Sequence, residues 1–157
     1  CGNSVEHIVL DSAELIMPRV DDCITLLLGS YKRRKSLEAG TGTYFMTKGW
    51  LRGERNIWKE YEYAVEKYGK ETGEEIFDMM FGNYSRIGIL DTKSCPIGPV
   101  LEETEIIAKE LHLSYEVFDA SYDYIIRLLT GPWDNEHFLK VNRGSEICFS
   151  DLTLMEE

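Results

Sequence analysis

The motifs that usually reveal an enzyme's chemistry are missing from this chain of 157 residues. No GxGxxG follows an apolar strand, and neither GxxxxGK[ST], GxSxG nor HExxH occurs. The usual dinucleotide, nucleotide, serine-hydrolase and zinc-protease assignments therefore lose their support. Histidine is scarce as well, with three residues in all. Any function must be argued from other residues.

The chain also lacks positive charge and long apolar runs. Its 28 acidic residues outnumber 17 basic ones and give a net charge of −11, which argues against binding nucleic-acid phosphates or anionic lipid. No segment approaches the roughly 20 apolar residues that a membrane helix needs. A composition with 43% hydrophobic residues is that of a globular protein with an adequate core. We expect a single domain, 1–157, that meets a small molecule, a protein partner or a second copy of itself.

Cysteine is sparse and irregularly spaced. The four residues are Cys1, Cys23, Cys95 and Cys148, and they lack the CxxC spacing of a zinc ribbon or a thioredoxin motif. Two disulfides in a secreted protein are one use of four cysteines, but an α/β domain with its own core does not need them. We expect free or metal-bound thiols and a cytoplasmic location.

Short apolar runs alternate with helical periodicities along the chain. The pattern predicts strands at 15–17, 43–47, 86–92, 115–118 and 138–141, and helices at 24–30, 57–68, 72–81, 100–111 and 121–130. The segment 86–118 has the length of a βαβ crossover. This alternation predicts an α/β fold with a doubly wound, largely parallel sheet and helices on both faces, which is a Rossmann-like arrangement.

An arginine, two carboxylates and a thiol lie together after the strand predicted at 15–17. Asp21 or Asp22 can cap the following helix, which places Cys23 in its first turn. The helix dipole there favours the thiolate, the form that binds metals or attacks electrophiles. A small buried hydrophobe is the other interpretation of Cys23.

In parallel α/β sheets, ligands bind outside the carboxyl ends of the strands. This rule collects candidate residues from several strand ends onto one edge of the predicted sheet. They are Cys1, Arg19, Asp22, Cys23, Thr47, Gly49, Trp50 and Asp91. We expect Cys1 and Cys23 to be metal ligands and the others to surround the metal or its substrate. A loop cap for Asp91 and a packing role for Trp50 are the alternatives.

Three motifs follow one another in a fixed order. They are Cys1-Gly2-Asn3, then Pro18-Arg19-x-x-Asp22-Cys23-Ile24 with Leu28-Gly29-Ser30, then Thr43-Tyr44-x-x-Thr47-x-Gly49-Trp50. In this order and spacing they resemble the family catalogued as domain of unknown function 1638, found in archaea, including methanogens, and in anaerobic bacteria. The resemblance implies an additional N-terminal lobe with another cysteine, so that this chain would be the C-terminal two-thirds. It also implies a link with corrinoid-dependent methyl transfer.

Three functions stay open at this point. The first, which we predict, is a protein that binds zinc or an iron–sulfur cluster through Cys1 and Cys23, with an exchangeable position on the metal. The second is a hydrolase that uses Cys1 as an N-terminal nucleophile, with its own amino group as the base. The third is a non-catalytic partner or chaperone of a corrinoid protein, in which the acidic surface forms the interface.

Overall fold

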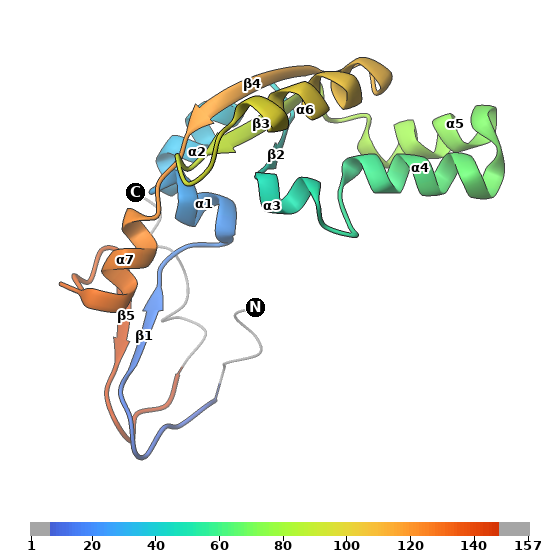
Figure 1. Cartoon of the computed structure of the whole chain (residues 1–157). Helices are drawn as coiled ribbons and strands as arrows, with labels where there is room; N and C mark the ends of the chain where they lie inside the picture. Colours follow the sequence, from blue (N-terminus) through green and yellow to red (C-terminus); the bar gives the residue numbers. More distant parts are fainter. Residues whose placement is uncertain (1–6, 148–157) are drawn as a thin grey trace. The chain divides into compact units, whose positions relative to one another are not determined.

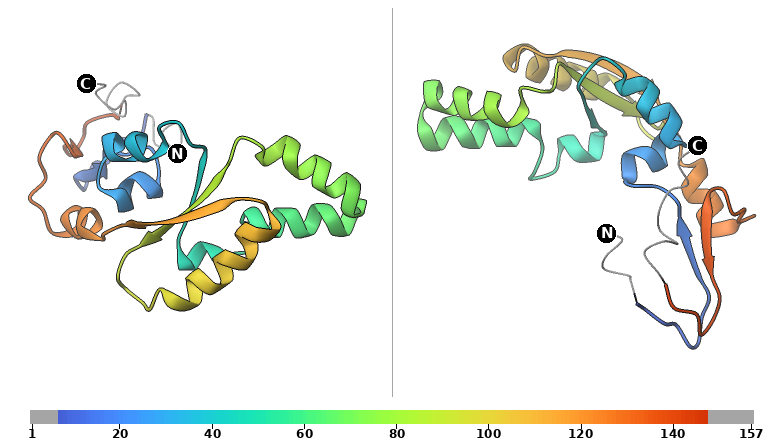
Figure 2. Two further views of the ribbon diagram at one scale, coloured as in Figure 1. Left: turned by 90° about the horizontal axis from the view of Figure 1, so that it is seen from above. Right: turned by 180° about the vertical axis from the view of Figure 1, so that it is seen from behind.

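The structure, a computed structural model, describes residues 7–147 and divides into two compact units. One unit combines the described residues up to Tyr31 with those from Ser121 onward, and the other runs continuously from Lys32 to Ala120. Figures 1 and 2 draw the elements of both units coloured along the sequence. The elements predicted for one domain therefore fall into two separately packed sets.

The continuous unit is built on a parallel sheet. Its strands are β2 (Thr43–Met46), β3 (Arg86–Asp91) and β4 (Ser114–Asp119). Within the described residues the order is β2-β3-β4, with Ile87 opposite both Tyr44 and Tyr115. Four successive residues of β3 are buried, as its continuous apolar run predicts for a central parallel strand. A mixed α/β fold with a parallel sheet is therefore confirmed.

Helix α2 (Tyr31–Glu38) contributes no buried side chain. Most of the core beside this sheet comes from the helices α3 (Lys48–Leu51), α4 (Ile57–Tyr68), α5 (Lys70–Phe81) and α6 (Gly98–Glu110). Met46, Ile57 and Ile87 are fully buried in one cluster that joins the sheet to these helices. Burying a side chain of this size stabilises the folded state by roughly 1.5–3 kcal/mol. Among the described residues, no helix is both long enough and apolar enough to cross a bilayer.

Helices α4 and α5 form a hairpin (Figure 1). Gly69 joins them with a φ of 82°, in the left-handed region that glycine adopts readily. Gly73 of α5 allows this helix to approach α4 closely, because a Cβ at position 73 would lie 2.7 Å from the Cα of Val65 in α4. The rings of Tyr61 and Phe77 meet edge to face across the hairpin, 5.3 Å apart.

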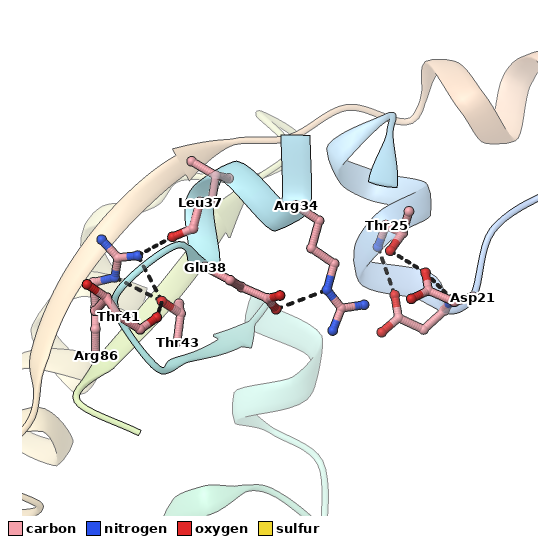
Figure 3. A network of polar contacts seen from close by, with 9 residues as sticks. Asp21, Thr25, Arg34, Leu37, Glu38, Thr41, Thr43 and Arg86 are labelled. Carbon is pink, nitrogen blue, oxygen red and sulfur yellow. Dashed lines mark hydrogen bonds and ion pairs between the residues drawn. The ribbon is translucent and has the colours of Figure 1, made fainter. Parts of the chain in front are cut away.

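Arg86 of β3 connects the neighbouring strands β2 and β4 and helix α2 (Figure 3). Its guanidinium donates to the carbonyl of Leu37 in α2 and to Oγ1 of Thr43 in β2, at 2.7 and 2.8 Å. The same group pairs with Glu116 of β4 and lies over the ring of Phe118. One largely buried cation thus ties three strands and a helix together, with its donors satisfied.

The other unit contains a two-stranded antiparallel sheet. Strand β1 (Leu15–Pro18) pairs with β5 (Phe138–Val141), so that Leu15 lies opposite Val141. Helices α1 (Cys23–Leu28) and α7 (Asp123–Thr130) pack against each other. The buried side chains of this unit include Ile24, Leu28, Tyr124 and Phe138.

Two sequence predictions differ from the structure. The doubly wound, Rossmann-like sheet is not confirmed, because the strands predicted at 15–17 and 138–141 pair with each other, and β1 is only half-buried. The helix predicted over 24–30 ends at Leu28, since Gly29 turns into the left-handed region with a φ of 84°. The basic run after Ser30 therefore belongs to a separate helix, α2.

Candidate functional site

Two aspartates organise the junction between β1 and α1 (Figure 3). Oδ1 of Asp22 accepts a hydrogen bond from the backbone N–H of Thr25 at 2.9 Å, which makes Asp22 the N-cap of α1. Oδ1 of Asp21 accepts a hydrogen bond from the Thr25 hydroxyl at 2.5 Å. Thr25 is fully buried, so both of these donors are satisfied inside the protein. The predicted cap is confirmed and is supplied by Asp22.

Cys23 is the first residue of α1 and is exposed. Ile24 and Leu28 are 5% and 2% exposed, so the helix buries its apolar face and leaves Cys23 on the solvent side. The interpretation of Cys23 as a buried packing residue is therefore wrong. An accessible thiol in the first turn of a helix can bind a metal or attack an electrophile. Cys1, the second predicted ligand, lies outside the described residues.

Arg19 is half-buried immediately before this junction. Its backbone N–H donates to the carbonyl of His137 at 2.8 Å, and the hydroxyl of Tyr124 donates to the same carbonyl at 2.5 Å. Burial raises the pKa of Tyr124, while the backbone of Arg19 and the charge of Arg127 act in the opposite direction. These contacts hold Arg19 against the turn that precedes β5.

One group of side chains in residues 7–147 has the spacing of a metal site, although the sequence pattern does not single it out. Ligand atoms of Asp134, Glu136 and His137 lie within 4.8 Å of one another. The carboxylate of Asp134 is already engaged, because it accepts from the backbone N–H of His137, lies 2.7 Å from its Nδ1 and pairs with Arg127. The hydrogen bond with His137 holds the pKa of Asp134 at about 2. This carboxylate is the cap of an exposed turn.

Thr47, Gly49 and Trp50 lie where β2 ends. Oγ1 of Thr47 accepts from the N–H of Trp50 at 3.4 Å and caps the short helix α3. The side chain of Trp50 is partly buried against the hydrophobic core, so its predicted packing alternative is confirmed. Gly49 is exposed. Buried Asn56 donates to the carbonyls of Trp50 and Leu51 and fixes the turn that follows.

Asp91 lies at the end of β3 and anchors a three-residue ion cluster. Its carboxylate accepts from the backbone N–H of Lys93 and pairs with Nζ of Lys93 at 2.6 Å. The same ammonium lies 2.9 Å from Oδ1 of Asp119, at the end of β4. The hydrogen bonds with Lys93 lower the pKa of Asp91 and raise that of Lys93 in return. The predicted loop-cap role of Asp91 is thereby observed.

The candidate residues divide between the two units. Arg19, Asp22 and Cys23 belong to the unit that contains β1, whereas Thr47, Gly49, Trp50 and Asp91 belong to the unit with the parallel sheet. Because β1 is not a strand of the parallel sheet, the rule that gathers strand ends at one edge applies to the second set alone. Lys93 was not predicted from the sequence, since a lysine in a polar loop carries no signal of its positive φ of 58° or of its two carboxylate partners.

Comparison with known proteins identifies the chain's family. A family model described as Protein of unknown function (DUF1638) matches residues 1–129. This range includes every residue predicted for the site. No curated protein and no solved structure matches the chain. The family supplies neither activity nor substrate, so function must be argued from the residues themselves.

Proposed function

The chain belongs to the DUF1638 family of proteins of unknown function, and we propose that it binds zinc or an iron–sulfur cluster with Cys23 as one ligand. The observation that carries this proposal is the exposure of Cys23 at the first position of α1. Cysteine is among the residues most often buried in proteins, and here the neighbouring side chains of the helix are buried instead. A thiol held at the surface by a capped helix is accessible to a metal ion, which supports ligation over packing.

Cys1 is the proposed second ligand, and it rests on the sequence alone. Two thiolates do not complete the coordination of zinc or of a cluster iron, so further ligands or an exchangeable position are required. Arg19 and Asp22 are the proposed neighbours of the metal or its substrate. Asp22 caps α1 through Oδ1 and directly precedes Cys23, which supports its assignment to the surroundings of the metal.

The second set of candidates has a different proposed task. These residues lie at the carboxyl ends of β2 and β3, where ligands of parallel sheets bind: Thr47, Gly49 and Trp50 follow β2, and Asp91 is the last residue of β3. Thr47 caps α3, Trp50 packs against the core, and Asp91 accepts a hydrogen bond from the loop after β3. We assign these residues to a small-molecule site of the continuous unit, separate from the proposed metal ligands.

Metal analysis of the full chain tests the proposal. The wild-type protein, prepared without oxygen, should contain zinc or iron by elemental analysis, with a visible absorption band if a cluster is present. Cys23→Ser should lose most of that metal. Cys95→Ser is the matched control, because Cys95 is a half-buried thiol in the other unit, and it should keep the metal. A metal-free wild-type protein, or a fully loaded Cys23→Ser variant, would contradict the proposal.

A metal-free result would favour the partner role instead. In that case the chain would act as a non-catalytic partner or chaperone of a corrinoid methyltransferase system, and Cys23→Ser would bind the corrinoid protein as the wild type does. The net charge of −11 would then make such binding dependent on salt. Intact mass tests the hydrolase role, since a nucleophilic Cys1 must be the first residue of the mature protein.

A further inference from the structure

A shallow groove lies in the continuous unit between α3 and the first turns of α6. Its lining residues are Lys48, Leu51, Arg52, Pro99, Val100 and Glu103. Leu51 and Val100 are buried and form an apolar floor, while the charged side chains stand around it. The left view of Figure 2 shows α3 beside the beginning of α6.

Two cations of the groove lining, Lys48 and Arg52, have no partner among the described residues. Among residues 7–147, neither Lys48 nor Arg52 makes an ion pair or a side-chain hydrogen bond. Lys93 and Arg86 of the same unit are each paired with carboxylates. In a chain with 28 acidic and 17 basic residues, two neighbouring unpaired cations over an apolar floor favour an external anion.

The start of α6 adds a second positive element to the same groove. Ile97 is its N-cap and provides no side-chain hydrogen bond, and Pro99 lies in the first turn. No side-chain oxygen therefore caps this 13-residue helix, so the positive end of its dipole adds to the charge of the groove. Pro99 has no N–H, and the N–H of Val100 donates to the carbonyl of Ile97 at 2.9 Å, so the helix start acts through its dipole and the N–H of Gly98. Glu103 is the one acidic side chain in the lining, and it opposes an anion.

The position of the groove agrees with a ligand site. Helix α3 follows the end of β2, and α6 follows the loop after β3, and these two strands are neighbours in the parallel sheet. Ligands of parallel α/β sheets bind beyond the carboxyl ends of such strands. We propose that this groove binds the phosphoryl group of a small molecule through Lys48 and Arg52. A dianion is favoured over a carboxylate because two cations and a helix start together outweigh the charge of Glu103.

Titration of the full chain with inorganic phosphate tests this site. Amide shifts of Lys48, Gly98 and Val100 should saturate in a ¹H–¹⁵N spectrum, and acetate at equal ionic strength should bind at least about fivefold more weakly. The double variant Lys48→Met, Arg52→Met should weaken phosphate binding by about tenfold or more. Arg55→Met is the matched control, since Arg55 is exposed, close in sequence and absent from the lining, and it should stay within about twofold.

The variant Glu103→Gln should change the phosphate affinity in the opposite direction to the double variant. Removing this negative charge should tighten phosphate binding by at least about twofold, which a folding defect cannot imitate. The proposal is overturned if phosphate causes no saturable shifts at the groove, if acetate binds equally well, or if the double variant binds as the wild type does. The metal content of Cys23 variants has no bearing on any of these outcomes, so this proposal and the proposed function fail independently.

Discussion

Polar side chains at or after strand ends in this protein accept hydrogen bonds from nearby backbone N–H groups. Asp22 and Thr47 each accept a hydrogen bond from the N–H three residues further on, and Asp91 accepts one from the N–H of Lys93. The two helix caps, Asp22 and Thr47, each stabilise a helix by about 0.5–2 kcal/mol, and Asp91 fixes the loop after β3. Cys23 has no comparable duty, because in the described part of the chain its thiol makes no hydrogen bond. Exposure without a local role distinguishes Cys23 from the other candidates of its unit.

Lys93 combines an ion cluster with an unfavourable backbone, and two variants separate the effects. Lys93→Ala and Lys93→Gly both remove the pairs with Asp91 and Asp119, but only glycine adopts the φ of 58° without cost. We expect the glycine variant to be more stable by about 1 kcal/mol, the left-handed penalty less the entropy that glycine gains on unfolding. Urea unfolding measures the difference. Equal stability of the two variants would mean that this backbone is not strained.

Gly73 is the residue on which the packing of the α4–α5 hairpin depends. In Gly73→Ala the new Cβ would lie 2.7 Å from the Cα and N of Val65, so the two helices must separate. We expect a loss of about 1–3 kcal/mol, even though alanine is the better helix former by about 1 kcal/mol. Thermal or urea unfolding checks this value.

The control for the hairpin is a glycine with room around it. Gly49→Ala places a Cβ 3.7 Å from Oγ1 of Thr47, an ordinary contact within helix α3. This variant should be neutral or slightly more stable. A Gly73→Ala variant as stable as Gly49→Ala would show that α4 and α5 do not need the close approach.

Elements were predictable from the sequence where apolar periodicity is strong. The run Ile87–Leu90 predicts a covered central strand, and Ile57, Tyr61 and Ala64 predict the buried stripe of α4, because burial itself imposes these spacings. The pairing of β1 with β5 was not predictable, since strands of four residues carry no record of their partner. The expectation of one sheet failed for that reason.

The candidate site was predictable only in its local part. The cap at Asp22 and the position of Cys23 follow from residue types at a strand-to-helix junction. Lys48 and Arg52 did not stand out, because a lysine and an arginine near a strand end are common on surfaces. Their interest lies in the missing carboxylate partners and in the facing start of α6, and both are properties of tertiary structure.

At the scale of the whole molecule, the two units differ in continuity. The segment from Lys32 to Ala120 is one uninterrupted stretch, and the buried cluster around Met46, Ile87 and Ile107 comes from that stretch alone. A unit with its own core and sheet is expected to fold without the rest of the chain. The other unit joins two segments that are distant in sequence, so it offers no such fragment.

We therefore predict that a fragment of residues 32–120 unfolds cooperatively in urea. Trp50 and Trp58 both pack against its core, so tryptophan fluorescence and far-UV circular dichroism should report the same midpoint. The same fragment with Ile89→Asp is the control, because Ile89 is 1% exposed and a buried unpaired carboxylate should abolish the transition. A gradual, non-cooperative change in the unsubstituted fragment would show that the parallel sheet depends on residues outside this segment. A cooperative transition would let the phosphate groove, whose lining lies within 48–103, be studied apart from the cysteines at positions 1 and 23.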